Sequence, residues 1–220
     1  MEIIARIYTD FKEKFGIPRQ SGLSGNIGKI VFEPTYRRPE ALRGLEGYSH
    51  IWLIWQFSEL KRTEWSPTVR PPRLGGNRRV GVFATRSPYR PNPIGLSSVR
   101  IREIRKTENE GTVLIVEGAD LLDGTPIYDI KPYLTFTDSH PDAVCGFADE
   151  VSGESLSVVI PKEIREELSE VELSELTSLL SQDPRPRYKP DGDMEYGMSF
   201  GKKNVNFKVC DNTLTVTKIK

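Results

Sequence analysis

The chain has 220 residues, of which 37% are hydrophobic, and its 31 basic residues balance 31 acidic ones. This length fits one large domain, or a main domain with a small second one. The sequence holds no run of about 18 consecutive apolar residues, which argues against a membrane-spanning helix.

Short apolar runs separated by glycine and proline predict β-strands over roughly the first 145 residues. Ile3, Ala5 and Ile7 alternate with other residues, and the run 48–57 is rich in aromatic and β-branched side chains. Helical periodicity does not occur between these runs at the spacing of a βαβ repeat. We therefore expect residues 1–150 to form a mainly β, closed or barrel-like domain. Further strands are predicted at 30–32, 80–84, 96–104, 113–116 and 133–136.

The pattern changes after about residue 150. Apolar residues recur at helical spacing after Pro161, which predicts an acidic helical segment over 161–182. Alternating apolar residues at 205–209 and 214–218 predict a C-terminal β-hairpin. Residues 151–220 are therefore expected to form a small α+β subdomain.

The zero net charge hides a strong segregation. Residues 61–105 contain eleven basic and two acidic side chains, whereas residues 138–181 contain eleven acidic and two basic ones. A basic block of this kind points to phosphate or nucleic acid as a ligand. The alternative is a solvated surface whose charges pair with the acidic segment inside the fold.

Two loops combine the residue types of a binding site. Residues 80–97 open like a buried strand and then interleave Arg86 and Arg90 with three prolines. Proline fixes φ and removes a donor, so this loop is stiff and suits a pre-formed pocket. The segment 120–126 has the composition of a tight turn. Alternatively, Asp123 accepts hydrogen bonds from a ligand there.

Several common chemistries are disfavoured. The glycines at 22–28 lack the spacing of a phosphate loop, and no G-x-G-x-x-G is present. His50 and His140 have no companions at metal-ligand spacing, so no metal site is expected. Cys145 and Cys210 lie far apart, which excludes a cysteine-rich metal site and disfavours a disulfide framework. A reducing, cytoplasmic environment fits this cysteine usage best.

The segment after Gln182 is stiff and basic. It places Arg185, Arg187 and Tyr188 around two prolines. Unstacked RNA bases lie against guanidinium planes and tyrosine rings, so RNA binding is one interpretation of this segment.

Five segments in order resemble the TsaA/TrmO family of tRNA adenosine methyltransferases. The tail is also similar to this family, through 183–186, 196–198 and 204–207. Thr9-Asp10 stands where the family usually has Ser-Pro, which puts only the local loop shape in doubt. The five segments are residues 14–20, 44–50, 70–77, 80–97 and 123–133.

The resemblance implies an S-adenosylmethionine-dependent enzyme on a single-sheet β-barrel, working as a homodimer with the cofactor near the subunit interface. Its substrate would be N6 of threonylcarbamoyladenosine next to the anticodon. Arg185, Arg187 and Tyr188 would then contact the tRNA anticodon loop. Carried onto matching positions, the cofactor contacts would be Pro18, Arg19, Gln20, His50, Ile51, Arg86, Leu96, Asp123, Gly124 and Thr125.

The catalytic group stays open at this point. The acceptor nitrogen belongs to a urea and must lose its proton, so a general base is plausible, and His50 and Asp129 are candidates by residue type alone. Two other functions also remain: a non-catalytic RNA- or anion-binding β-barrel module, and a methyltransferase acting on a small molecule. Truncation after about residue 150 is expected to abolish tRNA methylation and to leave cofactor binding intact.

Overall fold

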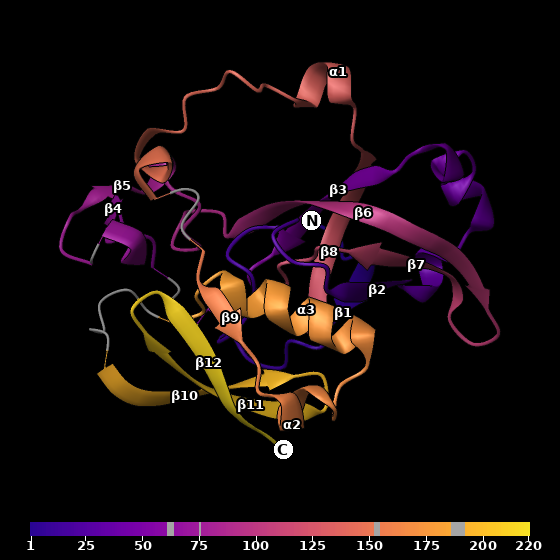
Figure 1. Cartoon of the computed structure of the whole chain (residues 1–220). Coiled ribbons are helices and arrows are strands. Elements are labelled where there is room, and N and C mark those ends of the chain that lie inside the picture. Colours follow the sequence, from indigo (N-terminus) through magenta and orange to yellow (C-terminus); the bar gives the residue numbers. More distant parts are fainter. Residues whose placement is uncertain (61–63, 75, 152–154, 186–191) are drawn as a thin grey trace.

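Six antiparallel strands form a closed barrel in the first two thirds of the chain (Figure 1). The computed structural model describes residues 1–60, 64–74, 76–151, 155–185 and 192–220. Around the barrel the strands follow the order β1-β2-β7-β6-β3-β8, and β8 pairs with β1 to close it. The strands are β1 (Ala5–Tyr8), β2 (Ile27–Phe32), β3 (His50–Gln56), β6 (Ile94–Thr107), β7 (Gly111–Glu117) and β8 (Thr125–Pro132).

Alternation along the strands builds the barrel core. In β3 every second residue is buried, so Ile51, Leu53 and Trp55 point inward while their neighbours point outward. Val99 of β6 and Leu114 of β7 belong to the same cluster of buried side chains.

The contact between β3 and β6 depends on one glycine. Trp55 lies opposite Gly95 in the register of these two strands. A Cβ atom at position 95 would overlap the indole ring of Trp55. Glycine therefore lets the indole lie directly against the β6 backbone, at the end of β3 where the chain enters the next loop.

The C-terminal third has a separate core under a second sheet. Its strand order is β10-β11-β12-β9, with β9 parallel to β12. Helix α3 (Glu170–Ser181) packs Leu176 and Leu180 against Met198 and Phe207 of this sheet. A capping box between Ser169 and Glu172 begins the helix. The strands are β9 (Ser157–Val159), β10 (Gly192–Phe200), β11 (Lys203–Cys210) and β12 (Thr213–Ile219).

The remaining elements are short. Strands β4 (Thr68–Val69) and β5 (Val80–Gly81) form a small separate sheet. Helices α1 (Thr135–Asp138) and α2 (Lys162–Arg165) have one turn each. Six 3-10 turns span Pro34–Tyr36, Pro39–Leu42, Leu45–Gly47, Pro72–Leu74, Val82–Ala84 and Gly146–Val151.

The loop 9–24 joins the two cores. Phe11 is buried in the C-terminal cluster although it directly follows the first barrel strand, and Phe15 and Ile17 pack on the same cluster. Gly16 has φ +91°, and a Cβ there would lie 2.7 Å from the end of the Met198 side chain. The C-terminal sheet therefore shapes a loop that belongs to the N-terminal part of the sequence.

The prediction of a mainly β fold is confirmed, with corrections in detail. The first 150 residues hold the β4–β5 sheet besides the barrel strands, so they are not built on a single sheet. The expected strand at 80–84 ends at Gly81, and the one at 133–136 is wrong because a helix begins at Thr135. The helical segment 161–182 is two helices. The division of the chain at residue 150 stays a prediction.

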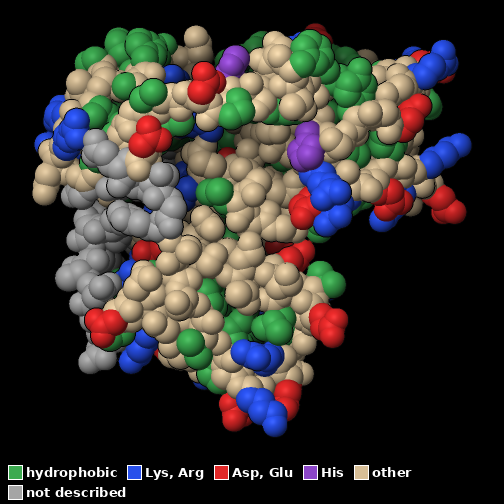
Figure 2. Space-filling model, turned by 45° about the horizontal axis from the view of Figure 1, so that its top comes forward, with side chains coloured by type: hydrophobic (Ala, Val, Ile, Leu, Met, Phe, Trp, Pro, Cys, Tyr) green, Lys and Arg blue, Asp and Glu red, His purple; other side chains and the backbone are tan. Residues whose placement is uncertain are grey.

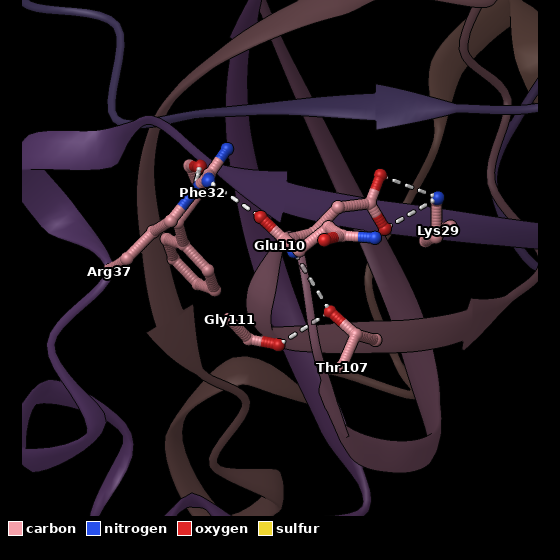
Figure 3. Close-up of polar contacts among 7 residues, drawn as sticks. Lys29, Phe32, Arg37, Thr107, Glu110 and Gly111 are labelled. Atoms are coloured by element: carbon pink, nitrogen blue, oxygen red, sulfur yellow. Dashed lines mark hydrogen bonds and ion pairs between the residues drawn. The ribbon is translucent and has the colours of Figure 1, made fainter.

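Basic side chains pair within the fold around the turn between β6 and β7 (Figure 3). Lys29 contacts Glu110 at 2.8 Å in the turn between β6 and β7. Arg37 donates to the carbonyl oxygens of Phe32 at 2.8 Å and of Asn109 at 3.3 Å. Lys29 is thus a residue of strand β2 whose charge is paired with a carboxylate.

On the face seen in Figure 2, acidic and basic side chains lie interspersed rather than in fields of one sign. Among the described residues, no helix is long and apolar enough to cross a membrane.

Gly95→Ala is expected to lower the free energy of unfolding by about 1–3 kcal/mol, because the added methyl group must displace the Trp55 indole from a packed core. Chemical denaturation of the variant and the parent protein measures the difference. Gly81→Ala is the matched control: its φ is −58° and an added Cβ would meet no atom within 4 Å. Equal stability of the parent and Gly95→Ala would contradict the packing argument.

Candidate functional site

A cavity of about 610 Å³ lies where the end of β3, the start of β6 and two proline-containing loops meet. This volume is typical of small-molecule sites. Six of the predicted cofactor contacts line it: Pro18, Arg19, Gln20, Arg86, Leu96 and Thr125. Other lining residues that the argument uses are Lys14, Trp55, Ser58, Glu59, Arg90 and Asp120.

The loop 85–93 holds its own shape and presents Arg86 to the cavity. Arg90 donates to the carbonyl oxygens of Thr85 at 2.7 Å and of Ser87 at 3.4 Å, which closes the loop on itself. Arg86 instead donates to the side-chain oxygen of Gln20, which comes from the N-terminal loop. The two arginines therefore differ: Arg90 braces the loop, and Arg86 joins the two loops that form the cavity wall.

Arg19 connects the cavity to the C-terminal third. Its guanidinium donates to the carbonyl oxygen of Asp183 at 2.6 Å and to that of Arg185 at 3.2 Å. Arg185 forms an ion pair with Asp183 at 2.8 Å, and only 11% of its side chain is exposed. Arg185 thus braces this segment. Its contact with tRNA stays a prediction, and Arg187 and Tyr188 lie outside the described residues.

The turn after β7 is tied to the N-terminal loop. The Asp123 carboxylate accepts from the Thr9 backbone N–H at 2.9 Å and contacts the Lys12 ammonium at 2.6 Å. Gly124 has φ +75°, which favours glycine, and its carbonyl accepts from Arg6 at 3.1 Å. These contacts favour the tight-turn interpretation. Asp123 and Gly124 stand beside the cavity-lining Thr125 but do not line the cavity themselves.

His50 and Ile51 lie away from this cavity within one chain. They occupy the start of β3, whereas Trp55 and the residues after it line the cavity, and six residues of strand span about 20 Å. Ile51 is fully buried in the barrel core. The His50 ring shares a hydrogen bond of 2.9 Å with the Ser49 hydroxyl and packs near Tyr133. The structure therefore does not bring these two residues to the other predicted contacts.

Asp129 faces a second cavity, of about 600 Å³, with Tyr36, Arg38 and Tyr48 among its lining residues. Its carboxylate forms an ion pair with Lys131 at 2.8 Å. Neither His50 nor Asp129, the two candidates for a base, lines the first cavity.

Asp120 lines the cavity and was not among the residues predicted from the sequence. Its Oδ1 accepts from the Ser97 hydroxyl at 2.5 Å, and that hydroxyl accepts from the Trp55 indole N–H at 2.9 Å. Burial raises the pKa of Asp120, while the Ser97 hydrogen bond and the nearby Arg86 charge oppose the rise. The only sequence signal was an aspartate four residues after the predicted strand 113–116 and three residues before the aspartate that the turn pattern emphasised. Ser58 and Glu59 were missed in the same way, just after the strand at 48–57.

The fold and the cavity together define a β-barrel protein with a small-molecule site of mixed charge between stiff loops. Comparison with known families makes this specific. The profile described as the tRNA-methyltransferase O N-terminal domain matches residues 6–139, and the TrmO C-terminal domain matches residues 153–220. The chain belongs to the tRNA-methyltransferase O family.

Individual relatives agree with this assignment. The chain is 41% identical to the tRNA (adenine(37)-N6)-methyltransferase of Escherichia coli, over 96% of this chain and 93% of that protein. It is 42% identical to a putative S-adenosylmethionine-dependent methyltransferase of Pseudomonas aeruginosa, over 89% of this chain and 86% of that protein. A crystal structure of TrmO superimposes with a TM-score of 0.80 at 32% identity, covering 99% of this chain and 96% of the other.

Removing residues 151–220 is expected to weaken S-adenosylmethionine binding as well as tRNA methylation, in contrast to the expectation from sequence. The deletion exposes Phe11, Phe15 and Ile17 and removes the carbonyl oxygens that hold Arg19. Calorimetric titration and thermal unfolding of the truncated chain test this. Unchanged cofactor affinity in the truncated chain would show that the loop holds its shape alone.

Met198→Ala, which removes a buried contact with the same loop, is expected to lower the free energy of unfolding by about 2–5 kcal/mol.

Proposed function

We propose that this chain is an S-adenosylmethionine-dependent methyltransferase that methylates N6 of adenine 37 in tRNA. We further propose that this base carries a threonylcarbamoyl group, that it lies in the anticodon loop, and that residues 151–220 bind this loop. The observation that carries the proposal is the cavity, because six positions expected from the family resemblance converge there from segments far apart in sequence.

The donor set of the cavity suits the cofactor. Arg86 offers a guanidinium for the carboxylate of its methionine part, in the charge-assisted geometry that such pairs favour. Trp55 and Leu96 supply apolar surface for the adenosine part. Two of the expected contacts, Asp123 and Gly124, would act by fixing the turn rather than by direct contact.

The bound cofactor supplies a methyl group activated by a positively charged sulfur. What this chain contributes is position and environment. Direct displacement requires N6 to be aligned with the methyl carbon, and the stiff loops around Arg86 and Gln20 limit how far the reactants move. The reaction would remove the positive charge from sulfur, and the partly apolar lining of the cavity favours that change.

We also propose that the protein works as a homodimer. Apolar side chains are exposed beside the cavity: Phe83 is 73% exposed, Leu96 55% and Tyr89 43%. Exposed apolar residues that gather in one place are typical of an interaction surface. A second copy of the chain seated there would cover them.

Arg86→Ala is expected to weaken S-adenosylmethionine binding by about 10–100-fold, the equivalent of a lost charge-assisted hydrogen bond of about 1.5–3 kcal/mol. Calorimetric titration measures it. Arg105→Ala is the control, because Arg105 pairs with Glu103 toward the other end of β6. Absence of saturable binding by the folded parent protein, with and without tRNA, would favour the non-catalytic RNA- or anion-binding module. Binding without methylation of tRNA that carries threonylcarbamoyladenosine would favour a small-molecule substrate.

Arg187→Ala is expected to raise the KM for tRNA and to leave cofactor affinity unchanged. A lost phosphate contact also reduces the slope of log affinity against log salt concentration by about one. Filter binding of tRNA at several salt concentrations measures the slope. An equal slope for variant and parent would remove Arg187 from the tRNA contacts.

A further inference from the structure

We propose that Asp120 accepts the proton that N6 loses during methyl transfer, and that Ser97 and Trp55 hold its carboxylate in place. This assignment rests on the proposed function and names the group that the sequence left unidentified. It is distinct from the two earlier candidates, neither of which lines the cavity.

The position of Asp120 is the first argument. Among the described residues that line the cavity, the carboxylates are those of Asp120 and Glu59. Glu59 is exposed on the loop after β3, and its contact with Lys14 uses its backbone carbonyl oxygen. Asp120 is partly buried in the loop between β7 and β8 and lies on the cavity wall. It is therefore the carboxylate that a substrate inside the cavity would meet away from bulk water.

The hydrogen-bond chain behind Asp120 is the second argument. An indole N–H donates only, so the Ser97 oxygen must accept from Trp55 at 2.9 Å. Ser97 then gives its single hydrogen to Asp120 Oδ1, at 2.5 Å. Ser97 is 1% exposed and Trp55 is 7% exposed, so the bond between them is shielded from solvent. These two hydrogen bonds hold the Asp120 carboxylate in a defined orientation, as a hydrogen-bond acceptor.

The electrostatic surroundings agree with a proton acceptor. Burial raises the pKa of Asp120, and this is the largest effect. The groups that oppose it are the Ser97 hydroxyl on β6, the Arg86 guanidinium on the loop 85–93, and the backbone N–H groups of Ser21 and of Asp120 itself. A carboxylate whose pKa is raised but which still ionises near neutral pH is a better base than an exposed one.

The step balances without a further reactant. A bond forms between N6 and the methyl carbon while the bond between that carbon and sulfur breaks, and the bonding electron pair remains on sulfur. The N6 proton moves to the Asp120 carboxylate. The products are the methylated base, a neutral thioether and a protonated Asp120, which returns its proton to water before the next turnover.

The test is the single-turnover rate of tRNA methylation against pH, at saturating cofactor and tRNA. Asp120→Asn is expected to lower the rate by about 100-fold or more, a size typical of a lost general base, while calorimetric affinity for S-adenosylmethionine stays within about threefold. Glu103→Gln, an exposed carboxylate paired with Arg105, is the control and should behave as the parent. Asp129→Asn tests the rival base and is expected to retain the parent rate.

Ser97→Ala tests the role of Asp120 through the pH dependence of the methylation rate, which would not change if Asp120 were purely structural. The Ser97 hydrogen bond lowers the pKa of Asp120, so its loss raises that pKa. The rate falls as pH drops through the Asp120 pKa, and this acid limb should therefore shift to higher pH in Ser97→Ala. Trp55→Phe, which removes the donor to Ser97, should shift it in the same direction by a smaller amount.

The outcomes separate this inference from the proposed function. A parent protein that neither binds S-adenosylmethionine nor methylates tRNA would overturn both. An active parent with an Asp120→Asn rate within about threefold would overturn the assignment of Asp120 alone. If Asp120→Asn fails to fold, as judged by circular dichroism, the acid limb in Ser97→Ala decides, and an unshifted limb overturns the proposal.

Discussion

The contact between the Trp55 indole and the bare backbone at Gly95 is the constraint on which the rest of the site depends. Because position 95 carries no side chain, the indole lies against β6 and its N–H reaches Ser97, two residues further along that strand. Ser97 in turn reaches Asp120, in the loop that follows the neighbouring strand β7. One side chain that is part of the barrel core thus also orients a carboxylate on the cavity wall. The Ile-Gly-Leu sequence that ends the proline-rich loop has its physical reason in this packing.

A second dependence runs through the loop 9–24. One side of this loop places Phe11 in the core under the C-terminal sheet, and the other side lines the cavity through Arg19 and Gln20. The cavity and the C-terminal core therefore share a structural element, although the family profiles match the two parts of the chain as separate regions. Any change that loosens the C-terminal sheet is transmitted to the cavity through this loop, since Asp183 and Arg185 hold Arg19 by their carbonyl oxygens.

The sequence predicted those parts of the fold that local patterns determine. The aromatic and β-branched composition of 48–57 marked β3, and the alternating tail marked β11 and β12. Strand β8 was missed, and the turn composition of 120–126 overlaps its start; its prolines, Pro126 and Pro132, stand near the ends of the strand. In the site, stiff loops with arginines predicted a pocket correctly, but Asp120 gave no local signal. Its partners Ser97 and Trp55 lie 23 and 65 positions away in sequence, and the pairing of β6 with β3 and with β7 brings them together.

The charge of the cavity follows from which acceptors its cations meet. Lys14 and Arg90 donate to backbone carbonyl oxygens, and Arg86 donates to the amide oxygen of Gln20. Neutral acceptors orient these groups without cancelling their charge, so the described wall of the cavity keeps a positive field. Arg86 lies near the partly buried Asp120, and its charge opposes the rise in the Asp120 pKa that desolvation causes. In the proposed mechanism, this charge favours the ionised form of the carboxylate that accepts the proton, and the basic residues of the segment 61–105 that reach the cavity suit anionic groups of a ligand.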